Sequence, residues 1–273
     1  MDSNPTFFIL SKMKRKKDLK IFLDSQYELY NALSFIEKDP ISIPHSFTKK
    51  QDIEISGFWT AILSWGQRVT IINKANSLMD LMGQSPHDFI LNHHEKDRKV
   101  FLEFKHRTFN ATDSLYFLEW LQQFYRKNKS LEEAFVLDQK PGAFDMQKAL
   151  GNFHSHFFSL PEFPHRTRKH ISNPMKNSSA KRLNMFLRWM VRKDNAGVDF
   201  GIWNKIPSSA LHIPLDVHVH KIALQLKLTS RKQTDWKTVV EITNNLRKLD
   251  PVDPAKYDYA LFGLGVLGKD AIL

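Results

Sequence analysis

Apolar residues recur every three to four positions along most of this chain, which is the spacing of one face of an α-helix. Glycine is sparse, with 10 in 273 residues, and no stretch sustains the alternation of apolar and polar residues that indicates a strand. We therefore predict an all-α fold. The expected helices cover residues 18–37, a segment from Thr48 to Leu63, a segment from Ile71 that closes at Gly83, a short helix from Pro86, and residues 95–108, 113–127, 130–136, 143–158, 180–193, 216–228, 234–249 and 254–267. Residues 159–179, with prolines among basic residues, are predicted to form a long loop.

The composition excludes several classes of protein. Without cysteine, the chain can form no disulfide scaffold, zinc ribbon or Cys-ligated iron–sulfur cluster. Its longest apolar runs are a few residues, so no segment is expected to span a membrane. The first 30 residues carry a basic cluster without the apolar core of a secretory signal: Lys12, Lys14, Arg15, Lys16 and Lys17. We expect a cytoplasmic monomer with no cofactor. No metal is expected either, since His218 and His220 point to different sides of a helix and cannot both bind one ion well.

Positive charge is concentrated in one part of the chain. The net charge of +11 suits a polyanionic partner, nucleic acid first. Nine Lys and Arg, and no Asp or Glu, lie between His165 and Lys193. On the helix expected at 180–193, Leu183, Phe186, Leu187 and Met190 form a buried face, and Lys181, Asn184, Arg188 and Arg192 are expected on the opposite side. That side is either a solvated basic face or a surface that contacts phosphates.

The residues before this helix add a second reason to expect phosphate contact. Ser178 and Ser179 can cap its N-terminus, and the first N–H groups of a helix attract anions. The predicted nucleic-acid contacts of this region are Lys176, Ser178, Ser179, Arg182, Arg188 and Arg192.

Asp216 follows Pro214 and begins the amphipathic helix expected over residues 216–228. The plain interpretation is an N-cap, in which the carboxylate accepts hydrogen bonds from free backbone N–H groups and contributes about 1 kcal/mol. A carboxylate held in this way can also stabilise the positive charge of a reacting sugar. Both interpretations remain open from the residues alone.

Several segments together resemble the helix-hairpin-helix DNA glycosylases. Residues 213–223 resemble the Pro-x-Asp-x-His/Arg-Val-x-Arg-Ile/Leu segment of that superfamily, whose Asp is catalytic, and residues 61–68 resemble its early Leu-Ser-x-Gln segment. Lys181, 35 residues before Asp216, resembles the Lys that opens the second hairpin helix. Residues 257–265 resemble the closing helix of the archaeal 8-oxoguanine glycosylase branch. Taken whole, the chain looks most like a bacterial family of unknown function that carries the same segments.

The resemblance implies a two-lobed, helical, DNA-glycosylase-like domain over residues 51–273, with a cleft between the lobes and a helix-hairpin-helix-like element. Residues 1–50 would be an N-terminal extension with a basic helix. The implied function is DNA base-excision repair by a glycosylase, with or without β-lyase activity, on a damaged base such as an oxidised purine. RNA is not excluded as the polymer.

The resemblance also implies roles for single residues. Lys181 would attack C1′ of the sugar or contact a phosphate, and Asp216 would stabilise the oxocarbenium-like transition state. Gln67 and Arg68 would fill the gap left by an extruded base. The candidates for stacking on that base are Trp65, Trp189, Phe200 and Trp203, each of which could instead be a core residue.

One departure from the superfamily pattern supports a different function. The hairpin usually reads Leu-Pro-Gly-x-Gly-x-Lys, with glycines that let backbone N–H groups approach a phosphate, whereas residues 175–181 contain no glycine. The alternative is therefore a non-catalytic nucleic-acid-binding protein on the same fold. A third reading is a structural or protein-interaction domain whose basic face is merely solvated.

Overall fold

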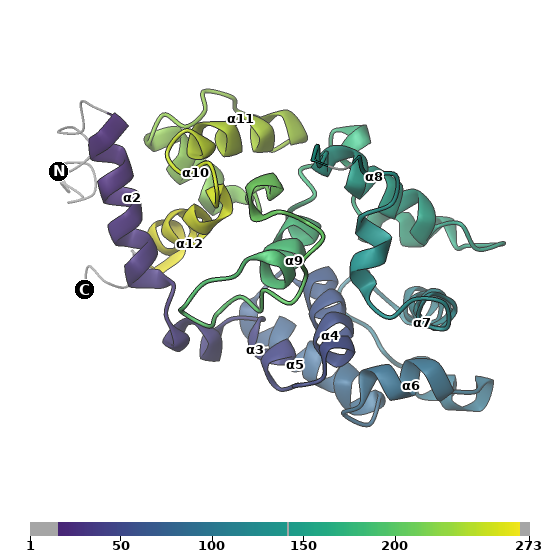
Figure 1. The fold of residues 1–273 in the computed structure, drawn as a ribbon. Helices are drawn as coiled ribbons and strands as arrows, with labels where there is room; N and C mark the ends of the chain where they lie inside the picture. The colour runs from purple at the N-terminus through teal and green to yellow at the C-terminus, as the bar shows by residue number, and fades with distance from the viewer. Residues whose placement is uncertain (1–15, 141, 268–273) are drawn as a thin grey trace.

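The computed structural model describes residues 16–140 and 142–267. Within these ranges the chain forms helices and isolated bridges but no strand, which confirms the predicted all-α class (Figure 1). The α-helices are α2 (Lys16–Tyr30), α3 (Ser42–His45), α4 (Lys50–Leu63), α5 (Arg68–Leu81), α6 (Pro86–Asn92), α7 (Ala111–Tyr125), α8 (Met146–Phe157), α9 (Lys181–Val191), α10 (Val217–Gln225), α11 (Trp236–Arg247) and α12 (Tyr257–Phe262). No helix of the described ranges is long and apolar enough to cross a bilayer.

Shorter helical turns connect these helices. The 3₁₀ helices are η1 (Leu33–Lys38), η2 (Glu95–Phe101), η3 (Leu131–Phe135), η4 (His165–His170), η5 (Pro174–Lys176), η6 (Ser208–Ala210) and η7 (Pro254–Lys256). A π-helical turn, η8 (Gly263–Leu267), follows α12 directly.

Two expected helices are wrong in part. The helix expected over 95–108 is the short η2 followed by a turn in which His106 pairs with Phe109, because buried residues three apart, such as Phe101 and Phe104, fit a 3₁₀ helix as well as an α-helix. The helix expected over 18–37 ends at Tyr30, and η1 follows as a separate element.

The helices form two groups with α9 between them (Figure 1). In one group α2, the first helix of the described chain, packs against α12, which also contacts α10. In the other group α4 is buried from Ile53 to Leu63 and contacts α3, α5, α6 and α9. Residues 16–38 therefore pack with the C-terminal helices; Lys16 and Lys17 begin α2, whereas Lys12, Lys14 and Arg15 lie outside the described residues.

A buried carboxylate on α4 organises the core of the second group. Glu54 has no exposed surface and accepts hydrogen bonds from four groups contributed by later segments. The donors are the Tyr125 hydroxyl, the Ser130 hydroxyl, the Leu131 amide and the Trp203 indole. A buried polar network of this kind is stable only while every member keeps its partner.

The substitution Glu54→Ala is expected to lower the free energy of unfolding by about 3–5 kcal/mol, because it leaves several buried donors without an acceptor. Urea unfolding followed by circular dichroism measures the change. The exposed Glu37 supplies the control, since Glu37→Ala is expected to change stability by no more than about 0.5 kcal/mol. Equal stability of the two variants would contradict the role assigned to Glu54.

Candidate functional site

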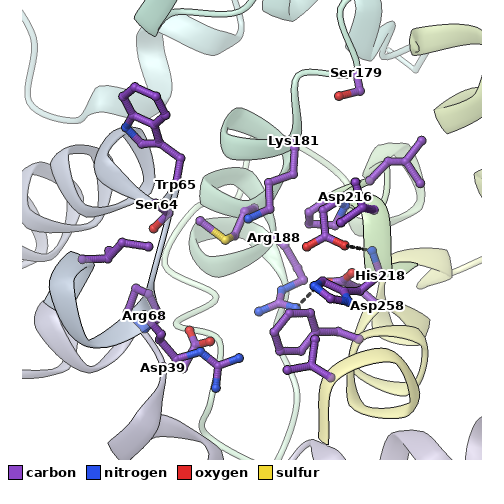
Figure 2. Close-up of a pocket in the computed structure, with 18 of the residues that line it drawn as sticks. Asp39, Ser64, Trp65, Arg68, Ser179, Lys181, Arg188, Asp216, His218 and Asp258 are labelled. Carbon is purple, nitrogen blue, oxygen red and sulfur yellow. Dashed lines mark hydrogen bonds and ion pairs between the residues drawn. The ribbon is translucent and has the colours of Figure 1, made fainter. Parts of the chain in front are cut away.

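A cavity of about 790 Å³ opens where the two helix groups meet (Figure 2). One wall comes from the end of η1 and from the turn between α4 and α5. The opposite wall comes from the loop before α10, from α12 and from η8, and α9 closes the space between the walls. Lys181 and Asp216, which are far apart in sequence, both line this cavity.

Lys181 is the first residue of α9, and an unusual backbone places it there. The preceding N-cap residue, Ala180, has φ 48°, and Asn177 has φ 62°, so both adopt the left-handed conformation. Asn177 occupies the position of the first glycine in the hairpin pattern, and asparagine enters this conformation more readily than most residues. The loop thus adopts a glycine-type turn without glycine.

The expectation that Ser178 and Ser179 cap α9 is wrong. The N-cap is Ala180, and no side chain accepts a hydrogen bond from the first turn of the helix. The Ser178 hydroxyl instead accepts a hydrogen bond from the Ala180 amide (3.3 Å), while Ser179 lines the cavity. The first N–H groups of α9 are therefore left without a side-chain cap, at the edge of the cavity.

The loop before α9, residues 174–180, is anchored to the start of α11. The side-chain amide of Asn177 donates to Asp235 (3.1 Å), and the Trp236 amide donates to the Asn177 carbonyl (3.2 Å). Burial acts to raise the pKa of Asp235, but hydrogen bonds from Thr238 and Asn177 outweigh it and lower that pKa to about 2. Asp235 is therefore a carboxylate at neutral pH and holds the loop firmly.

Asp216 is the N-cap of α10, which confirms the plain interpretation of its sequence position. One carboxylate oxygen, Oδ1, accepts hydrogen bonds from the amides of His218 and Val219, both at 2.9 Å. Within the described chain no hydrogen bond to Oδ2 is formed, and Figure 2 shows the carboxylate on the side of the cavity that faces Lys181. The cap orients Asp216 and leaves one oxygen for another partner.

A second carboxylate, Asp258 on α12, lies beside Asp216 in the cavity wall. Its Oδ2 accepts a hydrogen bond from Arg188 on α9 (2.5 Å). Burial raises the pKa of Asp258 to about 7, against the opposing effect of Arg188 and with a further contribution from the negative charge of Asp216. Asp258 is therefore held in the cavity wall by a buried arginine.

The prediction that Arg188 and Arg192 lie on an exposed basic face is also wrong. The two residues are only 3% and 1% exposed. Arg188 pairs with Asp258 and lies 3.4 Å from Asp199, and Arg192 binds Asp199 (2.9 Å). Arg192 also pairs with Asp194 and Asp253. Carboxylates from segments that follow α9 cover this side of the helix, so both arginines are structural and neither is free for a phosphate.

The pH dependence of stability tests the environment of Asp258. A carboxyl whose pKa is raised from 3.8 to about 7 keeps its proton in the folded protein after the unfolded chain has lost it. Its contribution to stability is therefore greatest below about pH 4 and is lost as the pH rises towards 7. Between pH 5 and 7, the unfolding free energy of the wild type is expected to fall relative to that of Asp258→Asn by about 1 kcal/mol per pH unit. Urea unfolding at pH 5, 6 and 7 measures the difference, and parallel pH profiles would contradict it.

The four candidate aromatic residues have different locations. Trp65 lines the cavity, as a base pocket requires. Trp189 and Trp203 are buried in the core, so their assignment to the pocket is wrong. Phe200 packs against His45, with ring centres 4.3 Å apart, and does not line the cavity. Helical spacing predicts burial for such residues, but it does not distinguish the wall of a cavity from the interior of the core.

The remaining predicted contacts differ in accessibility. Gln67 and Lys176 are exposed, and Arg68 is half-buried in the cavity wall. Arg182 donates to the main-chain carbonyls of Ile62 (2.6 Å) and Lys169 (3.3 Å). Its guanidinium therefore ties α9 to α4 and to η4, and the prediction of a free phosphate contact at Arg182 is wrong.

Some cavity residues were not predicted from the sequence. Phe35 and Phe262 contribute aromatic walls, and Asp39 contributes a third carboxylate. Arg107 stacks on Trp65 at 5.1 Å, which requires Gly66: that residue has φ 111°, and a Cβ there would lie 2.9 Å from Arg107. No local pattern marks Phe35, Asp39 or Phe262, because each reaches the cavity only through the packing of separate helices.

Comparison with known proteins places the chain in a family. Residues 39–267, most of the chain, match the family described as "Protein of unknown function (DUF2400)", and the chain belongs to it. No curated protein and no solved structure matches the chain. The match begins at Asp39 and includes all the residues that line the cavity except Phe35.

Proposed function

We propose that this member of the DUF2400 family is a cytoplasmic DNA base-excision enzyme, a glycosylase with β-lyase activity on a damaged base. The observation that carries the proposal is the placement of Lys181 and Asp216 on one cavity between two groups of helices. A lysine amine and a carboxylate at one site are what a reaction through a cationic sugar and a Schiff base requires.

The two residues would have different tasks. The neutral amine of Lys181 would attack C1′ of the sugar, and the C1′–N bond would break with the electron pair and a proton going to the base. The C1′–O4′ bond would then break, with a proton going to O4′, to leave a Schiff base between C1′ and the Lys181 nitrogen, and loss of a C2′ proton would expel the 3′ phosphate. Asp216 would stabilise the positive charge that develops on the sugar during the first step, through the oxygen that the α10 cap leaves free.

The cavity suits an extruded base for a separate reason. A base must leave the helical stack before its glycosidic bond becomes accessible, and the pocket that receives it needs flat, mostly apolar walls. Trp65, Phe35 and Phe262 supply aromatic surface in a cavity large enough for one nucleotide base. We identify the two helix groups with the lobes of a glycosylase-like fold, and the 174–180 loop with its hairpin.

Phosphate contact would come from the 174–180 loop and its neighbours. Lys169 and Lys176 are exposed and form no ion pair with any residue of the described chain, and the uncapped first turn of α9 is adjacent. The left-handed turn at Asn177 supports this assignment, because it is the backbone conformation that the glycine of the hairpin pattern provides.

The proposal is tested with a panel of DNA duplexes that each contain one oxidised, deaminated or alkylated base, together with an abasic duplex. The expected result is release of at least one class of base and cleavage of the abasic strand, resolved on denaturing gels. Salt-sensitive binding without any product would favour the alternative, a non-catalytic nucleic-acid-binding protein. Matched RNA substrates determine which polymer the site accepts.

A further inference from the structure

Asp39 is a cavity residue whose buried carboxylate is only partly satisfied by hydrogen bonds within the described fold. It follows η1 as its C-cap and is only 8% exposed. Its Oδ1 accepts a hydrogen bond from the Ile41 amide (3.1 Å), and its Oδ2 accepts none from any described residue. Burial raises the pKa of Asp39 against the opposing effects of the Ile41 amide and of the Arg188 charge. Such a carboxylate, only partly satisfied at a cavity wall, is stabilised by a further hydrogen-bond donor.

A hydrogen-bond donor lies beside it. The half-buried guanidinium of Arg68, at the start of α5, lines the same wall and contributes to the positive potential at Asp39. Arg68 forms no ion pair within the described ranges, and its guanidinium carbon lies 5.3 Å from the centre of the Phe262 ring. Figure 2 shows Asp39 and Arg68 together on the wall opposite Asp216. One wall thus presents an acceptor and a donor, and the other presents Asp216.

The space between the walls is bounded mainly by apolar side chains. Phe35 and Phe262 meet edge to face with ring centres 6.2 Å apart, and Ile71 and Met185 add aliphatic surface. A flat ring in this space would gain contact area from these side chains but would form few hydrogen bonds with them. Discrimination between bases therefore falls to the polar groups on the walls, among them Asp39 and Arg68 on the wall opposite Asp216.

We propose that Asp39 and Arg68 together read a lactam edge on the extruded base, Asp39 accepting the ring N–H and Arg68 donating to the adjacent carbonyl. This inference rests on the proposed function and names its substrate class. Guanine-type, hypoxanthine-type and uracil-type bases carry an N–H next to a C=O on the pairing edge. Adenine-type and cytosine-type bases present a bare ring nitrogen and an amino group, so an acceptor would face an acceptor and a donor would face a donor.

The variant Asp39→Asn separates base reading from sugar chemistry. Asn keeps the oxygen that caps the Ile41 amide but replaces the acceptor for the base by an amide. Release of 8-oxoguanine, hypoxanthine or uracil, whichever the wild type removes, is expected to fall about 10- to 100-fold. Borohydride trapping on a preformed abasic duplex is expected to stay at the wild-type level, because that substrate has no base to read. Retained trapping also shows that the variant is folded.

Glu37→Gln is the matched control, since Glu37 is an exposed carboxylate two residues away that does not line the cavity. It is expected to match the wild type in both assays. A wild type that releases only adenine-type or cytosine-type bases would overturn the lactam assignment, and so would an Asp39→Asn variant that releases lactam bases at the wild-type rate. Either result leaves the proposed glycosylase standing. A wild type that neither releases a base nor forms an adduct would overturn the proposed function and this inference together.

Discussion

Lys181→Ala is expected to abolish borohydride trapping on an abasic duplex and to lower strand cleavage at least about 10³-fold, because the substitution removes the only proposed nucleophile. Alanine is the strongest helix former and suits the first position of α9, so the fold is expected to persist. The half-buried position of Lys181 on the cavity wall, rather than its charge alone, underlies this expectation. Gel analysis of the covalent adduct after reduction measures the effect.

Lys176→Ala is the matched control for loss of a lysine from the same region. Lys176 is exposed, lies five residues earlier and does not line the cavity. It is expected to weaken DNA binding modestly, in a salt-dependent way, and to form the adduct normally once bound. Trapping by Lys181→Ala at the level of Lys176→Ala would show that Lys181 is not the nucleophile.

Asp216→Asn is expected to lower the single-turnover rate of base release by about 10²- to 10⁴-fold while leaving DNA affinity close to that of the wild type. The substitution removes the negative charge but keeps the side-chain oxygen that accepts hydrogen bonds from the His218 and Val219 amides. Asparagine caps helices about as well as aspartate, so α10 is expected to remain intact. Rapid-quench kinetics and a binding titration provide the two readouts.

Asp145→Asn supplies a control with the same substitution in the same structural role. Asp145 is the exposed N-cap of α8, accepts a hydrogen bond from the Lys148 amide and does not line the cavity between the helix groups. Wild-type kinetics are expected for it. If both Asn variants lost base release equally, weakened capping would explain the loss; if neither did, Asp216 would have no role in the reaction.

Local physical chemistry explains what the sequence predicted of the fold. Amphipathic spacing predicted most helices because burial of one helix face is a local pattern, and the cap at Asp216 was predicted because an N-cap depends only on the next few residues. The all-α class follows from the same patterns. The resemblance to glycosylases singled out Lys181 and Asp216, which the structure places on one cavity.

The errors arise where distant segments meet. Periodicity identified the face of α9 that packs on α4, but it carried no information about Asp199 and Asp258, which cover the opposite side and bury Arg188. The same limit applies to Asp39, which lines one cavity with Arg68 from a different helix. Charge counted along the sequence therefore overstated the charge on the surface, since arginines such as Arg192 neutralise buried carboxylates.

The most direct measurement is borohydride trapping of the wild-type protein on an abasic duplex, followed by protease digestion and mass spectrometric identification of the modified residue. The proposed function predicts one reduced covalent adduct, attached at Lys181. An adduct at another amine, or no adduct with any duplex under conditions where the protein binds DNA, would contradict it.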